Sequence, residues 1–114
     1  MLEENFVPLS TVVVDRKAFE GAGAFEDGFR VSCDYLFWIR LSCRAAFAFD
    51  PDTLVDYRIH GRNLTADFRT TYAENVRVLD LLLADEAASL GEVRLRRARS
   101  LVQWKWAIRE VIAG

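Results

Sequence analysis

The chain has 114 residues, of which 52% are hydrophobic and 28% are charged, a balance that favours one packed domain over disorder. Its 15 basic and 17 acidic residues give a net charge of -2, which disfavours nucleic acid as a partner. No apolar run reaches the roughly 18 residues of a membrane span, and the acidic start Met1–Glu4 is unlike a signal peptide. We therefore expect a cytoplasmic protein.

The first part of the chain reads as a strand followed by a short helix. Residues Leu9–Val14 are rich in β-branched side chains, which is typical of a buried strand. A short helix is expected over Asp15–Glu20, and Gly21 and Gly23 end it.

A helix rich in aromatic residues is predicted from a cap at Ser32 to about Arg44. Most of it should be buried, and its apolar positions include Tyr35, Leu36, Trp38, Ile39 and Cys43. Cys33 and Cys43 lie about 15 Å apart along this helix, which is too far for a disulfide bond. We expect both thiols to be reduced.

Two further strands are predicted over residues 45–49 and 53–60, with a tight turn at Asp50-Pro51-Asp52 between them. The second segment alternates the apolar residues Val55, Tyr57 and Ile59 with the ionisable residues Asp56, Arg58 and His60. Because side chains of a strand alternate between its two faces, one face should pack and the other should meet water or a cleft.

Beyond residue 65 the apolar residues follow a helical period. Tyr72, Val76, Leu79 and Leu83 form one stripe, Gly91 breaks the helix, and a second helix is expected over Glu92–Ile112. The buried stripe of that second helix is predicted as Ala98, Leu101, Trp104 and Ile108. The chain is therefore predicted to be an α+β fold, with a partial sheet of about three strands in residues 1–65 and a helical hairpin in residues 66–114.

Asp34 falls in the first turn of the predicted aromatic helix. An acidic residue there commonly complements the helix dipole, which stabilises the helix by about 0.3 to 1 kcal/mol. A carboxylate held at a helix start beside a cleft could also accept the proton of an attacking hydroxyl group. The residue pattern leaves both interpretations open.

The only histidine, His60, shares a predicted strand face with Arg58. It could be a surface or structural residue, or it could bind a metal or a phosphate group beside the Arg58 guanidinium. Asp50 and Asp52 have the spacing of a carboxylate pair for a divalent metal, but two aspartates around a proline are more typical of a turn.

Four arginines, Arg94, Arg96, Arg97 and Arg99, occupy two turns of the last predicted helix. They could touch an acidic membrane surface, although such a group usually solvates the outside of a helix.

Several short motifs follow one another in a definite order. They are Asn5 and Ser10 before the first predicted strand, Arg16-Lys17, Gly23-Ala24-Phe25-Glu26-Asp27, Asp34-Tyr35-Leu36-Phe37-Trp38-Ile39-Arg40, and Tyr57-Arg58-Ile59-His60. In this order they resemble the second half of a family 2 glycosyltransferase with the GT-A fold. The resemblance covers about residues 5–65.

The resemblance implies an inverting transfer of a sugar from a nucleotide-sugar donor to an acceptor hydroxyl, with Asp34 as general base. It also implies substrate contacts for Tyr35, Trp38 and Arg58, and a place for His60 in the shell of a divalent metal, manganese or magnesium. Two departures weaken the acidic cluster, because Cys33 and Leu36 stand where the family commonly has acidic residues.

The half of such an enzyme that binds the nucleotide has no recognisable counterpart in these residues, which contain no Gly-rich phosphate loop. We therefore expect a fragment that binds no metal and is inactive alone. One alternative is a non-catalytic interaction domain that binds another chain, either a different protein or a second copy, through the helical hairpin and an exposed sheet edge. Another is a small metal-dependent hydrolase built on His60 and the aspartates.

Overall fold

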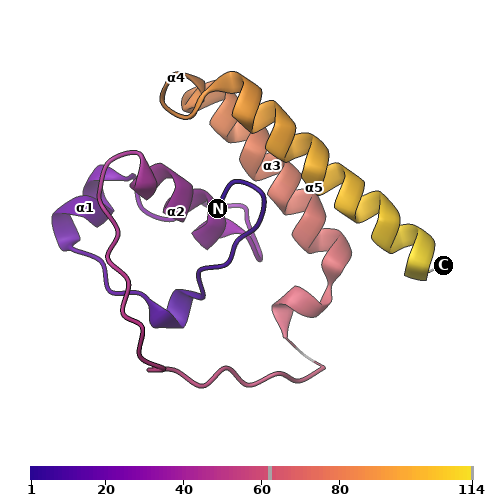
Figure 1. Cartoon of the computed structure of the whole chain (residues 1–114), viewed down its shortest axis with the longest axis horizontal. Helices are drawn as coiled ribbons and strands as arrows, with labels where there is room; N and C mark the ends of the chain where they lie inside the picture. The colour runs from indigo at the N-terminus through magenta and orange to yellow at the C-terminus, as the bar shows by residue number, and fades with distance from the viewer. Residues whose placement is uncertain (62, 114) are drawn as a thin grey trace.

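The computed structural model describes residues 1–61 and 63–113, and the regular secondary structure of these residues is entirely helical. The α-helices are α1 (Arg16–Gly21), α2 (Cys33–Ser42), α3 (Phe68–Asp85), α4 (Ala87–Leu90) and α5 (Glu92–Ala113). Single turns of 3-10 helix lie at Leu9–Thr11 and Leu64–Ala66. Figure 1 shows α3 and α5 running side by side, with α1 and α2 to one side of this pair.

The predicted helical hairpin is confirmed. Asp67 caps α3 by accepting a hydrogen bond from the Thr70 backbone N–H at 3.2 Å. Gly91, at a φ of 86°, separates α4 from α5 in a conformation that favours glycine. None of the described helices is both long and apolar enough to cross a lipid bilayer.

The main core joins α2 to the hairpin. Its buried residues are Tyr35, Leu36 and Ile39 of α2, Val78, Leu79 and Leu82 of α3, and Leu95, Ala98 and Val102 of α5. A smaller cluster on the other side of α2 contains Ala22, Phe37, Trp38 and Leu41. Because α2 is apolar almost all round, it packs on both sides, and the predicted burial of this helix is confirmed.

The predicted buried stripe of α5 is wrong beyond Ala98. The side of α5 that packs against α3 carries Leu95, Ala98 and Val102, whereas Trp104 and Ile108 are 62% and 38% exposed. Both stripes have helical spacing, so periodicity alone could not decide which one faces α3.

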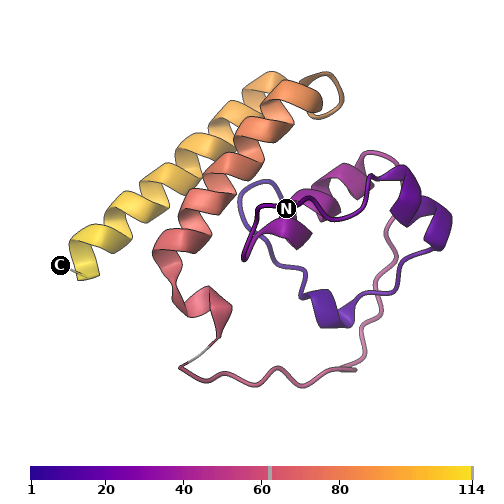
Figure 2. The same cartoon turned by 180° about the vertical axis from the view of Figure 1, so that it is seen from behind.

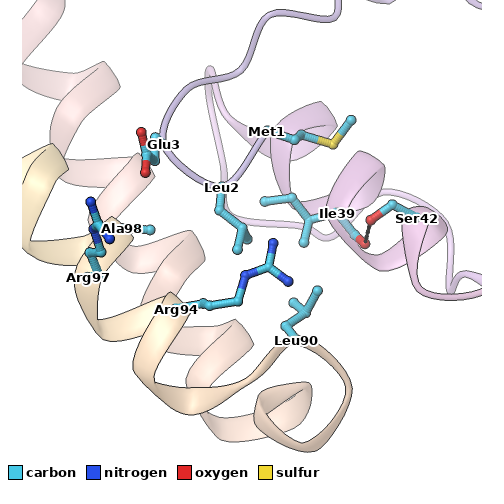
Figure 3. A pocket seen from close by; sticks show the side chains of 9 residues that line it. All are labelled: Met1, Leu2, Glu3, Ile39, Ser42, Leu90, Arg94, Arg97 and Ala98. Atoms are coloured by element: carbon cyan, nitrogen blue, oxygen red, sulfur yellow. Dashed lines mark hydrogen bonds between the residues drawn. The ribbon is translucent and has the colours of Figure 1, made fainter.

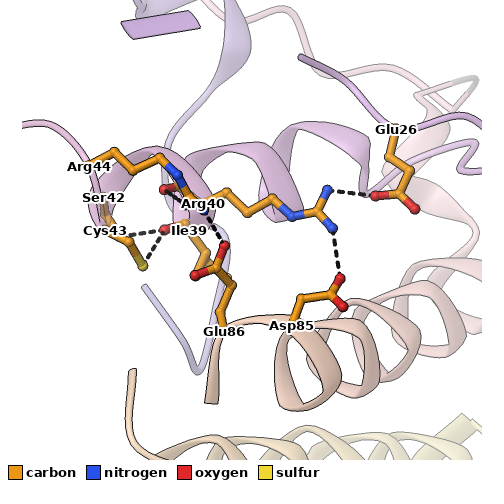
Figure 4. Close-up of polar contacts among 8 residues, drawn as sticks. All are labelled: Glu26, Ile39, Arg40, Ser42, Cys43, Arg44, Asp85 and Glu86. Atoms are coloured by element: carbon orange, nitrogen blue, oxygen red, sulfur yellow. Dashed lines mark hydrogen bonds and ion pairs between the residues drawn. The ribbon is translucent and has the colours of Figure 1, made fainter. Parts of the chain in front are cut away.

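Charged side chains tie the C-terminal end of α2 to the corner between α3 and α4. Arg40 pairs with Glu26 and with Asp85, and Arg44 pairs with Glu86 (Figure 4). Cys33 and Cys43 are free thiols, as predicted.

The prediction of an α+β fold is wrong, because the described residues contain no strand. Leu9–Thr11 is a 3-10 turn, and residues 45–60 have neither helix nor strand pairing. In Figures 1 and 2 this second segment runs as an irregular, stretched chain around the side of the molecule away from α5. A strand needs hydrogen bonds from a neighbouring strand, and β-branched or alternating residues cannot supply that neighbour.

Candidate functional site

Asp34 lies in the first turn of α2, where the sequence places it. Its Oδ1 accepts hydrogen bonds from the Asn5 side-chain amide at 3.2 Å and from the Tyr35 backbone N–H at 2.7 Å. The residue is half-buried, and desolvation by burial raises the pKa of Asp34 above its ordinary value of 3.8. The hydrogen bonds from Tyr35 and Asn5 offset part of that rise. A carboxylate with a raised pKa is a stronger base than an exposed one.

The backbone that leads into Asp34 is held by α3. The Glu74 carboxylate accepts hydrogen bonds from the backbone N–H groups of Arg30, Val31 and Ser32, each at 2.8 Å. Ser32 was predicted to cap α2 with its side chain, but its hydroxyl donates instead to Asn75 Oδ1 at 2.8 Å. The position of Asp34 is therefore fixed by side chains of α3 as well as by its own helix.

Tyr35 and Trp38, predicted to contact substrate, are buried in the two clusters on either side of α2. The Tyr35 hydroxyl donates to the Leu2 backbone carbonyl at 2.7 Å. Trp38 is 1% exposed, and its Nε1 is buried without a hydrogen-bond partner in the described part of the chain. In this structure both rings pack against other side chains on either side of α2, and their contacts with substrate stay a prediction.

Arg58 and His60 lie on the irregular segment and are exposed. Asn63 organises the end of this segment, because its Oδ1 accepts from the His60 backbone N–H at 2.9 Å and its Nδ2 donates to the Arg58 carbonyl at 3.2 Å. Asp34 is held by Asn5 and Tyr35, whereas Asn63 holds the backbone of Arg58 and His60.

Among the described residues, no group of three or more His, Cys, Asp or Glu side chains is placed to hold a metal ion. Asp50 accepts a hydrogen bond from the Asp52 backbone N–H at 3.0 Å, which is the arrangement of a turn. The ligand role predicted for His60 would need partners from outside these residues.

A pocket of about 440 Å³ lies on another side of α2. It is lined by Met1, Leu2, Glu3, Ile39, Ser42, Leu90, Arg94, Arg97 and Ala98 (Figure 3). Arg94 extends from α5 between Leu2 and Leu90 in this view. Local sequence patterns do not indicate this pocket, since the pocket brings together the chain start, the end of α2 and the first turns of α5.

Sequence reasoning also missed Glu74 and Asn75, which position the start of α2 from more than 40 residues away. A polar pair on an otherwise ordinary helix carries no signal of such a contact. Comparison of the chain with protein-family models, with curated proteins and with solved structures found no match.

Proposed function

We propose that this chain supplies the catalytic base of an inverting, nucleotide-sugar-dependent glycosyltransferase, and that Asp34 is that base. The observation that carries the proposal is the hydrogen bond between Asn5 and Asp34 at the start of a helix anchored in the core. Both residues belong to the motifs that resemble family 2 glycosyltransferases. The raised pKa of Asp34 supports the same role, because the carboxylate is a better proton acceptor than a solvated one.

In the proposed reaction the acceptor hydroxyl donates its proton to Asp34 while its oxygen forms a bond to the anomeric carbon of the donor sugar. The bond from that carbon to the diphosphate oxygen breaks, and the nucleoside diphosphate leaves with the electron pair. Attack opposite the leaving group inverts the anomeric centre. Because Asn5 and Tyr35 both donate to Oδ1, Oδ2 is the oxygen we assign to accept the proton.

The resemblance covers only the second half of such an enzyme, so we propose that residues from outside this chain complete the site for the nucleotide-sugar donor. We expect the isolated chain to bind UDP-, GDP- and TDP-sugars weakly or not at all. Isothermal titration of the chain with these donors and manganese tests this part, and micromolar binding would contradict it. We place the enzyme in the cytoplasm, where the two free thiols would stay reduced.

The proposal is tested with Asp34→Asn in the complete transferase, the chain together with its donor-binding part. The amide is isosteric with the carboxylate but cannot take the proton, so turnover should fall by about 10²- to 10⁴-fold while donor affinity is retained. Asp52→Asn is the matched control, since Asp52 is exposed on a turn. Unchanged turnover in Asp34→Asn would end the assignment.

A second candidate is a non-catalytic domain that binds another protein. The observation in its favour is the exposure of apolar side chains on residues 45–60, among them Phe49 at 89%, Leu54 at 73% and Ile59 at 84%. Exposed apolar surface of this kind promotes association. Light scattering that shows a monomer over a wide concentration range, with no partner retained on this segment, would argue against it.

A further inference from the structure

Helix α5 has a second apolar side that is largely exposed in the described structure. Its packed side carries Leu95, Ala98 and Val102, all at most 2% exposed. A neighbouring side, here called the free face of α5, consists of Val93, Arg94, Arg97, Leu101, Trp104, Ile108, Val111 and Ile112. From Arg94 to Val111 these residues follow one another at spacings of three and four, and Val93 and Ile112 lie next to the ends of this series, so all eight share one broad side of the helix. Val93, Val111 and Ile112 are each at least 80% exposed.

The four arginines in the first two turns of α5 divide between the free face and the rest of the helix. Arg96 pairs with Glu92 at 2.7 Å, and Arg99 pairs with Asp80 at 2.6 Å. On the free face, Arg94 and Arg97 make no ion pair or hydrogen bond with the described residues. Their charges are thus available to a ligand, while the other two are already neutralised by neighbouring carboxylates.

The two free arginines stand at the 440 Å³ pocket (Figure 3). The pocket offers the apolar side chains of Leu2, Ile39 and Leu90 beneath guanidinium groups. Its acidic lining residue is Glu3, which forms no ion pair with either arginine. A site with apolar walls and cationic groups at its rim suits a molecule that has a phosphate group beside an apolar body.

The free face has no acidic residue of α5. Glu92 and Glu110, the acids of this helix, lie on its other side and pair with Arg96 and Arg69. The free face therefore combines two unpaired cations at one end with Trp104 and aliphatic side chains toward the other. This is the composition of a helix that lies in a membrane interface, with its cations at the phosphates and its apolar residues at the acyl boundary.

We propose that the free face of α5 docks on an anionic phospholipid surface. Arg94 and Arg97 bind lipid phosphates, and Trp104, Ile108, Val111 and Ile112 enter the headgroup region. The helix lies along the surface, in keeping with the finding that no described helix is long and apolar enough to cross it. A second copy of the chain fits less well, because the unpaired arginines would face each other in a parallel pairing and aliphatic side chains in an antiparallel one, with no carboxylate of the face to pair them in either.

The experiment is cosedimentation of the 114-residue chain with vesicles of phosphatidylcholine alone, and of phosphatidylcholine mixed with an equal amount of phosphatidylglycerol. We expect binding to the mixed vesicles only. The double variant Arg94→Gln with Arg97→Gln should bind roughly 30-fold more weakly. Each arginine near an anionic surface strengthens binding by a similar factor, and the losses of the two arginines multiply. The variant Arg96→Gln with Arg99→Gln loses the same charge from paired positions and should bind within about threefold of the unchanged chain.

Trp104→Gln tests the apolar part of the free face and should also weaken binding to the mixed vesicles. Trp106→Phe should not weaken it, because the half-buried Trp106 lies off the free face and donates a hydrogen bond to Glu110. Circular dichroism verifies that each variant keeps its helix content. Equal losses in the two double-arginine variants, equal binding to both vesicle types, or a stable dimer that Trp104→Gln dissociates would each overturn the proposal. The last result would assign the face to a second copy.

Discussion

The side-chain amide of Asn5 donates a hydrogen bond to Asp34 Oδ1 at 3.2 Å and so connects the start of the chain to the start of α2. This bond favours the ionised carboxylate, while burial of Asp34 disfavours it more strongly. The balance leaves the pKa of Asp34 above 3.8. The hydrogen bond from Asn5 and the burial of Asp34 therefore both affect whether this carboxylate can serve as a base.

Asn5→Ala should raise the pKa of Asp34 further, because it removes a donor to the ionised form and leaves the burial in place. Carboxyl carbon NMR of the 114-residue chain, followed through the acid range, measures the effect. Asn63→Ala, on the irregular segment, is the control and should leave Asp34 unchanged. An equal or lower pKa in Asn5→Ala would show that the hydrogen bond does not act on Asp34.

Glu74→Gln should lower the free energy of unfolding at neutral pH by about 1 to 3 kcal/mol, since a carboxylate that binds three backbone N–H groups becomes a neutral amide. Urea unfolding measures the loss. Glu92→Gln, which breaks an exposed pair within α5, should cost less than about 0.5 kcal/mol. Similar losses in the two variants would mean that Glu74 does not hold the start of α2.

The contribution of Glu74 also depends on pH with a definite sign. Desolvation acts to raise its pKa, but the three backbone hydrogen bonds lower it to a net value below 4.5. The stabilisation by Glu74 is therefore present above its unfolded pKa and is lost as the pH falls through the folded pKa. The stability difference between the unchanged chain and Glu74→Gln should shrink across that acid range. A difference independent of pH would contradict this linkage.

Leu95→Ala should destabilise the chain by about 2 to 5 kcal/mol, because Leu95 is fully buried between α5 and its neighbours in the main core. Val93→Ala, two residues earlier on the free face, should change stability by less than about 0.5 kcal/mol. Denaturant unfolding of both variants compares the two sides of α5 directly. A larger loss for Val93→Ala would mean that the faces have been assigned the wrong way round.

Arg40→Met should cost about 1 to 3 kcal/mol, because it keeps the side-chain stem but leaves Glu26 and Asp85 without their shared cation. The Arg40 side chain is only 16% exposed, so solvent replaces this interaction poorly. Thermal unfolding of Arg40→Met and of Arg96→Met, whose pair is largely exposed, gives the comparison. If both variants lose the same small amount of stability, the ion pairs of Arg40 do not stabilise the contact between α2 and the α3–α4 corner.

The helices could be predicted from local pattern, and the rest of the fold could not. The second helix of the hairpin was expected over Glu92–Ile112 and is found over Glu92–Ala113, because a glycine stop and a helical period are both local signals. The strand over residues 53–60 was inferred from alternation, but a strand forms only when another segment pairs with it. No pattern within those residues supplies that partner.

Local sequence patterns also predict only part of the candidate site. The place of Asp34 in the first turn of a buried helix follows from Ser32 and the apolar residues after it. Its contact with Asn5 and the support from Glu74 join residues far apart in the chain, so local spacing does not reveal them. The predicted stripe of α5 is wrong beyond Ala98 for a related reason, since only contact with α3 selects Leu95 over Trp104 for burial.

The pH dependence of kcat/KM for sugar transfer by the complete enzyme tests the role of Asp34 most directly. We predict that activity falls on the acid side with one ionisation above 3.8, that Asn5→Ala moves this fall to higher pH, and that the residual activity of Asp34→Asn lacks it. If Asp34→Asn keeps full turnover and its kcat/KM still falls at low pH in the same way, another group accepts the proton.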